Sequence, residues 1–222
     1  MARAGGGRAG RGPAKGRRAA PRAPRQERGR RRVEAILDAA AALIWEHGVG
    51  GLTVHGIARR AGTSIGSMYH FFPDLDAVVA GLAERDVRSF EPVIAALAAR
   101  PAREWALLSA AAAADAIVTP IYSFLKVHPH TLLLLATPRA GARFHKRREE
   151  MRTAGLDLVE RIFAARLPVV RPPVRRARAA VIVGTIEGVL TLVNRARVDP
   201  GKASDELKRA VTAYLEAMEG TR

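Results

Sequence analysis

The chain has 222 residues, of which 48% are hydrophobic, so it is long enough to bury a substantial core. It contains no cysteine, which excludes disulfides, thiolate metal sites and cysteine-based catalysis. The formal net charge of +16 at pH 7 favours a polyanionic partner, either nucleic acid or an anionic membrane surface.

The positive charge is concentrated at the N-terminus. Residues 1–32 carry 12 Lys/Arg and one acid, a net charge of +11, whereas the remaining 190 residues carry 25 basic and 20 acidic residues, a net charge of +5. The segment consists mainly of Gly, Ala, Pro and Arg, so we expect residues 1–30 to form a disordered basic tail. Two interpretations stay open: the tail binds nucleic acid, or its composition reflects coding bias alone.

Membrane insertion is not indicated by the sequence. No uninterrupted apolar stretch reaches the roughly 18 residues of a spanning helix, and the N-terminus lacks the apolar centre of a signal peptide. We therefore expect a cytoplasmic protein that has no membrane partner.

Helical periodicity begins at Val33, where apolar residues recur on one face through Ile44. Gly48 is placed to end this helix. Thr53 then serves as the N-cap of a second, short helix from Val54 to Ala61. We expect a turn at Gly62 between this helix and the next.

Ser64 is placed to cap a third helix, Ile65 to Phe71, and Pro73 ends it. Asp74 is placed to cap a fourth helix that continues past Phe90 toward residue 97. Two short helices joined through a glycine turn, with a longer helix before them, are typical of a helix-turn-helix unit. The third helix begins with small polar residues, which suit contacts with phosphates and base edges.

The run from Thr53 to Phe72, TVHGIARRAGTSIGSMYHFF, resembles the signature of the TetR family. The resemblance covers about residues 30–82. It implies an all-α homodimer with an N-terminal three-helix helix-turn-helix DNA-binding domain and a C-terminal helical effector-binding and dimerisation domain. Family members commonly carry lysine where this chain has Leu75, so one expected phosphate contact is missing.

The resemblance, together with side-chain chemistry, implies roles in DNA binding. Thr53, Thr63 and Tyr69 are expected to position phosphates, and Ser64, Ser67 and His70 to contact phosphates or bases. Gly66 would permit close approach of the protein backbone to the DNA backbone. In the alternative interpretation, Tyr69 is an ordinary core aromatic, as Phe72 is expected to be, and Thr53 and Ser64 act only as helix caps.

Residues beyond Pro101 show a pattern typical of helices, which is interrupted at prolines. We expect helices at about 102–118, 121–127, 130–136, 141–165, 174–196 and 204–219. The last two carry wide apolar surfaces, which the resemblance assigns to a dimer interface. The residues predicted for that interface are Ile182, Ile186, Val189, Leu190, Val193, Leu207, Val211, Tyr214 and Leu215. Alternatively, these helices pack only within one subunit.

An effector pocket is expected among the central helices. Its candidate residues are Trp105, Asp115, Ile117, Tyr122, Phe124, Leu125 and Phe144. Aromatic and aliphatic residues of this kind are more often core residues than ligand contacts. Asp115, like Glu187, Arg139 and Arg143, is equally suited to a solvated face. The predicted domains are therefore a tail at 1–30, a DNA-binding domain at 31–90 and a ligand-binding and dimerisation domain at 91–222.

No catalytic constellation is evident, so we expect a protein that is not an enzyme and needs no cofactor. His128, His130 and His145 are conceivable metal ligands, but no carboxylate stands at a fixed spacing from them, so no metal site is predicted. The predicted function is a repressor released from double-stranded operator DNA by a small-molecule effector. The alternative is a ligand-independent, basic DNA-coating protein, which would show no preference for one palindromic site.

Overall fold

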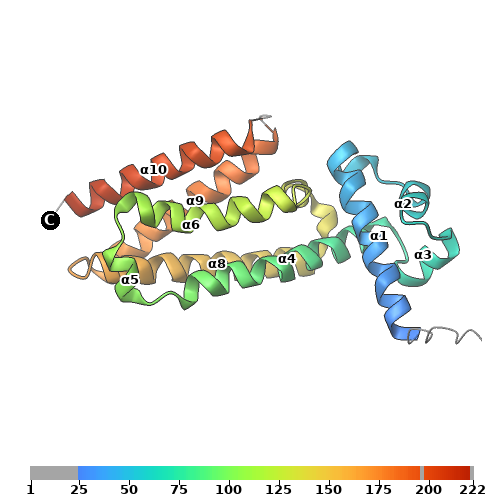
Figure 1. The fold of residues 1–222 in the computed structure, drawn as a ribbon, viewed down its shortest axis with the longest axis horizontal. Helices are drawn as coiled ribbons and strands as arrows, with labels where there is room; N and C mark the ends of the chain where they lie inside the picture. Colours follow the sequence, from blue (N-terminus) through green and yellow to red (C-terminus); the bar gives the residue numbers. More distant parts are fainter. Residues whose placement is uncertain (1–24, 196–197, 221–222) are drawn as a thin grey trace, which may run out of the picture.

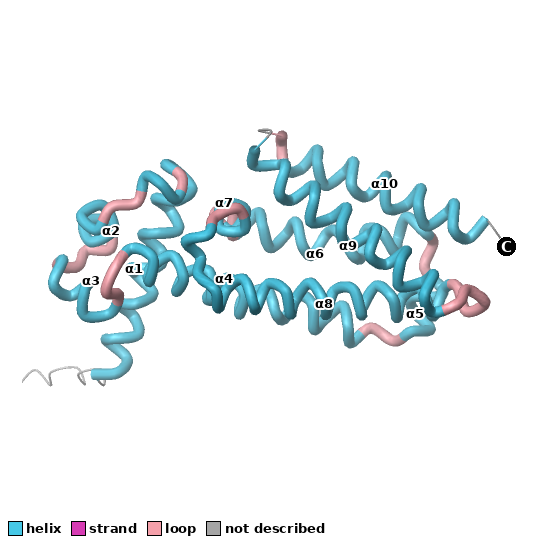
Figure 2. Tube along the Cα trace, turned by 180° about the vertical axis from the view of Figure 1, so that it is seen from behind, coloured by secondary structure: helices cyan, strands magenta, loops and turns pink. Residues whose placement is uncertain are grey.

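The computed structural model describes residues 25–195 and 198–220, and within these ranges all regular structure is helical (Figures 1 and 2). Most of the expected tail, residues 1–24, lies outside the described residues. The helices are α1 (Arg25–His47), α2 (Val54–Arg60), α3 (Ile65–Phe71), α4 (Leu75–Ala99), α5 (Ala102–Leu107), α6 (Ala110–Val127), α7 (Thr131–Leu135), α8 (Gly141–Arg166), α9 (Pro172–Arg195) and α10 (Pro200–Gly220), with 3₁₀ turns at Val49–Gly51 and Pro138–Ala140.

Helix α1 begins at Arg25, eight residues before the first residue of the expected apolar stripe, so residues 25–30 are helical and not part of a tail. The extension is stabilised locally, because Glu27 accepts hydrogen bonds from Arg30 and Arg31, both at 3.1 Å. These bonds lower the pKa of Glu27, that from Arg30 most strongly. Gly29 also lies close to the ring of Phe71, which places the extension beside the end of α3.

The turns and caps expected for α2, α3 and α4 are confirmed. The Thr53 hydroxyl accepts the N–H of Gly56 at 3.0 Å, the Ser64 hydroxyl accepts the N–H of Ser67 at 3.1 Å, and the Asp74 carboxylate accepts the N–H of Ala77 at 2.7 Å. Each bond satisfies a backbone donor that a helix start leaves free. Gly48 and Gly62 have φ of 73° and 61°, a left-handed conformation that glycine adopts without steric cost.

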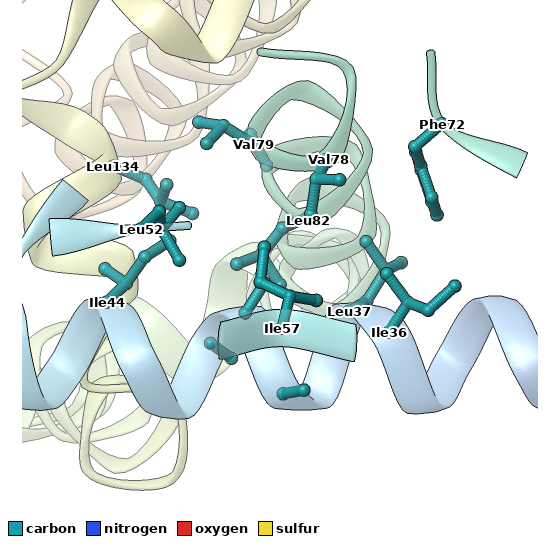
Figure 3. Packing of buried hydrophobic residues seen from close by; sticks show 14 of the residues in the cluster. Ile36, Leu37, Ile44, Leu52, Ile57, Phe72, Val78, Val79, Leu82 and Leu134 are labelled. Atoms are coloured by element: carbon teal, nitrogen blue, oxygen red, sulfur yellow. The ribbon is translucent and has the colours of Figure 1, made fainter. Parts of the chain in front are cut away.

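Helices α1 to α4 surround one hydrophobic cluster that includes Ile36, Ile44, Ile57 and Leu82 (Figure 3). The cluster also contains Leu134 of α7 and Phe144 of α8, which come from the second half of the chain. The N-terminal unit therefore has no separate core of its own.

Helix α4 joins the two halves of the molecule without a break and crosses the predicted domain boundary at residues 90 and 91. Its first turns belong to the N-terminal cluster, whereas Leu97 belongs to a second cluster formed mainly by α6, α8, α9 and α10. Arg85 of α4 ties the helix to α1 through ion pairs with Glu34 at 3.2 Å and Asp38 at 2.7 Å.

The expected helices at 102–118 and 121–127 are replaced by short α5 and by α6, which runs through Pro120. Ser109 caps α6 by accepting the N–H of Ala112 at 3.2 Å. Pro120 removes one helical hydrogen bond, but buried Ile117, Val118 and Leu125 on either side hold the helix against its neighbours. α6 is also the single described helix long and apolar enough to cross a membrane, a composition that core helices share.

Helices α9 and α10 lie side by side along the C-terminal half (Figures 1 and 2). Six of the nine residues predicted for a dimer interface are buried inside the protomer, which corrects that prediction: Ile182, Ile186, Val193, Leu207, Val211 and Leu215. Val189, Leu190 and Tyr214 are half-buried. The exposed face of α9 contains a different set, which recurs with helical periodicity: Val181, Gly184, Thr185, Gly188 and Leu192.

Candidate functional site

The side chains of α3 divide between the core and solvent. Met68 is fully buried, whereas Ile65, Gly66, Tyr69 and His70 are exposed, with half of the Tyr69 surface accessible. The interpretation of Tyr69 as a core aromatic is therefore wrong, while Phe72 is buried as expected. A short helix that presents hydroxyl, imidazole and backbone groups to solvent has the chemistry needed for phosphates and base edges.

Gly66 lies on this face with open space around it. A Cβ atom built at Gly66 meets no atom of the described residues within 4 Å. Glycine is therefore not required at this position by packing within the chain, although it costs about 1 kcal/mol of helix propensity relative to alanine.

A cationic side chain from the basic start of α1 completes this face. Arg32 of α1 donates a hydrogen bond of 3.1 Å from Nη1 to the hydroxyl of Ser67. The hydroxyls of Thr53 and Ser64 accept backbone N–H groups and keep their own hydrogens free to donate. The basic start of α1 and the polar face of α3 thus form one surface.

Two other positions bear on the expected phosphate contacts. The Thr63 hydroxyl oxygen is buried and has no hydrogen-bond partner among the described residues, so it is not placed to reach a phosphate. Leu75, which replaces the lysine common in the family, is partly buried against the N-terminal cluster.

A cavity lies between α4, α6, α7, α8 and α9. The space amounts to about 1100 Å³, solvent at its mouth included, and its walls are largely apolar. Four of the seven predicted pocket residues line it: Ile117, Phe124, Leu125 and Phe144. Val87, Phe90 and Ile94 of α4 form another wall.

The other three predicted pocket residues lie elsewhere. Trp105 is buried with the Arg100 guanidinium 4.7 Å from its ring centre. Asp115 is exposed and pairs with Lys208 at 2.7 Å, and this bond, followed by that from Thr119, lowers the pKa of Asp115. The Tyr122 hydroxyl is buried outside the cavity without a partner in the described chain, and burial raises the pKa of Tyr122.

Charged groups stand among the apolar walls of the cavity. Glu187, suggested from sequence, lines it, whereas Arg139 and Arg143 instead pair with Asp76 and Glu84. Arg148 and Arg152 also line the cavity. Arg152 pairs with Glu149, whereas Arg148 makes no ion pair within 4 Å in the described parts of the chain. An unpaired guanidinium beside an apolar space is suited to a ligand that has an anionic group.

Asp86 of α4 is buried at the cavity wall. Its carboxylate accepts a hydrogen bond of 2.6 Å from the Thr131 hydroxyl and lies 3.1 Å from Nε2 of His130. His128 lies near this pair, and burial lowers its pKa. Sequence reasoning considered the two histidines but missed Asp86, although this residue continues the apolar stripe of Val78, Val79 and Leu82, where a lone carboxylate needs partners.

The described arrangement is that of a helical DNA-binding regulator: a helix-turn-helix unit with an exposed polar helix, joined through one long helix to a domain that encloses an apolar cavity. Two family models match the chain. Residues 36–82 match "Bacterial regulatory proteins, tetR family", and residues 109–215 match "Tetracyclin repressor-like, C-terminal domain". The chain therefore belongs to the TetR family of transcriptional regulators and is not an enzyme.

Solved structures support the same fold. A TetR-like transcriptional regulator from Rhodococcus sp. RHA1 superposes with a TM-score of 0.63 at 20% identity, covering 90% of this chain and 100% of that one. A TetR regulator from Haloarcula marismortui gives 0.64 at 16% identity, with 84% and 97% covered. FadR from Bacillus subtilis, in complex with stearoyl-CoA, gives 0.57 at 18% identity, with 82% and 98% covered. No curated protein matches the chain significantly in sequence.

Proposed function

We propose that this regulator is a repressor that leaves its operator when a small amphipathic molecule occupies the cavity. The observation that carries the proposal is the course of α4. Val78, Val79 and Leu82 of this helix lie in the core of the helix-turn-helix unit, whereas Val87, Phe90 and Ile94 of the same helix line the cavity. A ligand that moves one end of α4 therefore acts on the other.

On the DNA side, α3 enters the major groove with Ser64, Ser67, Tyr69 and His70 facing the duplex, and Gly66 allows close approach. Thr53 at the start of α2 contacts a phosphate. These assignments are supported by the exposure of Thr53, Ser64, Gly66, Tyr69 and His70, beside which Ser67 is half-buried. The buried hydroxyl of Thr63 argues against a role for that side chain.

The operator-binding form is a homodimer, because a palindromic operator presents two half-sites to a two-fold symmetric protein. The exposed face of α9 supports this arrangement. Gly184 and Gly188 lie on it, one helical turn apart, between Val181 and Leu192. Two small residues permit close helix crossing, and the half-buried Val189, Leu190 and Tyr214 border the same pair of helices.

The effector has an apolar body and an anionic group. The apolar walls accept the body, and Arg148 is placed for the anion. The stearoyl-CoA complex of FadR shows that a protein of similar fold binds a ligand of this chemistry. Such a regulator acts in the cytoplasm, where both its DNA and acyl metabolites are found.

The test compares matched ligands and one cavity variant. The operator is first located by footprinting the DNA upstream of the protein's own gene. Dodecanoate should release the protein from this operator at a lower concentration than dodecanol does. The Arg148→Gln variant should abolish that difference. Gly155→Phe, which fills the cavity from α8, should bind operator normally but ignore both ligands. Equal responses of wild type and Gly155→Phe would refute the effector site.

The preference for operator over other DNA distinguishes the proposed repressor from a ligand-independent DNA-coating protein. A coating protein binds operator and scrambled DNA equally at physiological salt, whereas the proposed repressor prefers operator by roughly 10³-fold or more.

A further inference from the structure

Three potential metal ligands converge where α4 meets the turn between α6 and α7. Asp86 lies on α4, His128 caps the end of α6, and His130 immediately precedes α7. One ligand atom from each side chain lies within 4.8 Å of the other two.

The spacing of the closest pair suits coordination. Nε2 of His130 lies 3.1 Å from Oδ2 of Asp86. With metal–ligand bonds of about 2.0–2.1 Å, neighbouring ligands of a tetrahedral site stand roughly 3.3 Å apart. His128, which is half-buried, offers the third ligand atom within 4.8 Å of the other two. Two imidazoles and one carboxylate are a common donor set for divalent transition metals.

The surroundings of Asp86 favour a cation. Arg85, the adjacent residue, directs its guanidinium to Glu34 and Asp38 instead. Within the described ranges the buried carboxylate therefore has no arginine or lysine partner, only the Thr131 hydroxyl and the His130 ring. A buried carboxylate without a permanent counter-charge is costly, and a bound metal ion supplies that charge.

Neighbouring groups hold the ligands in place. The Thr131 hydroxyl orients the Asp86 carboxylate through its 2.6 Å hydrogen bond. The Phe124 ring packs against the His128 ring with centroids 4.4 Å apart. Outer contacts of this kind fix the orientation of metal ligands.

We propose that Asp86, His128 and His130 form a binding site for a divalent transition metal such as Zn²⁺, which joins α4 to the α6–α7 turn. Three protein ligands leave one tetrahedral position open. Because Asp86 and Thr131 also line the cavity, a donor atom of the effector can occupy that position. This last step rests on the proposed effector function, whereas metal binding itself does not.

The test uses the full-length chain without an affinity tag, stripped with chelator and titrated calorimetrically with Zn²⁺. We expect one ion per chain and a rise in melting temperature with zinc. Asp86→Asn and His128→Gln should each weaken binding by at least about 10-fold. The matched control is His145→Gln, an exposed histidine of α8, which should bind zinc as the wild type does.

Co²⁺ provides a second readout that does not depend on the variants. Its visible absorption in the wild type should have the intensity of tetrahedral coordination, and Zn²⁺ should displace it. The proposal is overturned if the wild type binds less than one Zn²⁺ per chain, if His128→Gln binds as tightly as wild type, or if Co²⁺ shows only the weak absorption of the hydrated ion. Normal zinc binding in a protein that ignores every effector would refute the effector function and leave the metal site standing.

Discussion

The hydroxyl of Thr131 and the carboxylate of Asp86, 45 positions apart in the chain, are joined by a buried hydrogen bond of 2.6 Å. Thr131 begins α7, and Leu134 one turn later lies in the core of the helix-turn-helix unit (Figure 3). The bond thus connects α4 to a short helix that itself packs against the DNA-binding unit.

Removing the hydroxyl should destabilise the protein. Thr131→Val keeps the side-chain shape but deprives a buried carboxylate of a donor, so we expect a loss of about 1–3 kcal/mol in the free energy of unfolding. Urea denaturation followed by circular dichroism measures it. The control is Thr153→Val on the exposed face of α8, with no loss expected. Equal stability of the two variants would mean that solvent satisfies Asp86.

Gly66→Leu should separate DNA binding from folding. The substitution meets open space in the free protein and improves helix propensity, so thermal stability should stay equal or rise slightly. Operator binding measured by fluorescence anisotropy should be lost, because the new side chain stands where the DNA must approach. Gly220→Leu at the far end of α10 is the control and should bind normally. A marked drop in melting temperature of Gly66→Leu would place this position in the core.

Leu192→Arg should convert the dimer to a monomer. Leu192 is 57% exposed on the α9 face, so a charge there leaves the protomer intact but is buried without a partner when two copies meet. Light scattering at micromolar concentration measures the mass. Leu107→Arg, at a position 84% exposed on α5, should remain dimeric. A wild-type monomer would contradict the α9 interface outright.

Deleting residues 1–24 removes seven Lys/Arg but leaves α1 complete. We expect affinity for operator and scrambled DNA to fall by a similar factor, because binding to phosphates carries little sequence information. The slope of log affinity against log salt should flatten by about 0.9 for each phosphate that the shortened protein no longer neutralises. A salt series on both DNAs measures this, and an unchanged slope would exclude the tail from DNA binding.

The DNA-binding unit could be predicted from sequence because its signals are local. Thr53, Ser64 and Asp74 cap helices three residues before the N–H groups they accept, and Gly48 and Gly62 end helices at positive φ. Proline was a poorer guide at Pro120, where a break was expected. This residue lies inside α6, as Pro92 lies inside α4, because tertiary packing outweighs one missing hydrogen bond.

The cavity and the predicted interface depend on contacts between distant segments. Trp105 is a residue type common in ligand pockets, yet it packs against Arg100. Arg148 is a residue type common on solvated faces, yet it lines the cavity. Likewise, an apolar stripe on α9 does not reveal which side faces its own subunit. The start of α1 was missed because it is stabilised by the bonds from Arg30 and Arg31 to Glu27 and not by apolar residues.

The shared core of the N-terminal unit limits how this regulator can be rebuilt. A chimera that joins residues 31–90 to a foreign ligand-binding domain would cut α4 at the cavity and strip Leu134, Ala140 and Phe144 from the cluster they complete. A sensor engineered from this scaffold must therefore carry residues 131–144 along with its DNA-binding half, and a new ligand specificity is better sought by changing single cavity residues on α6 and α9 than by exchanging domains.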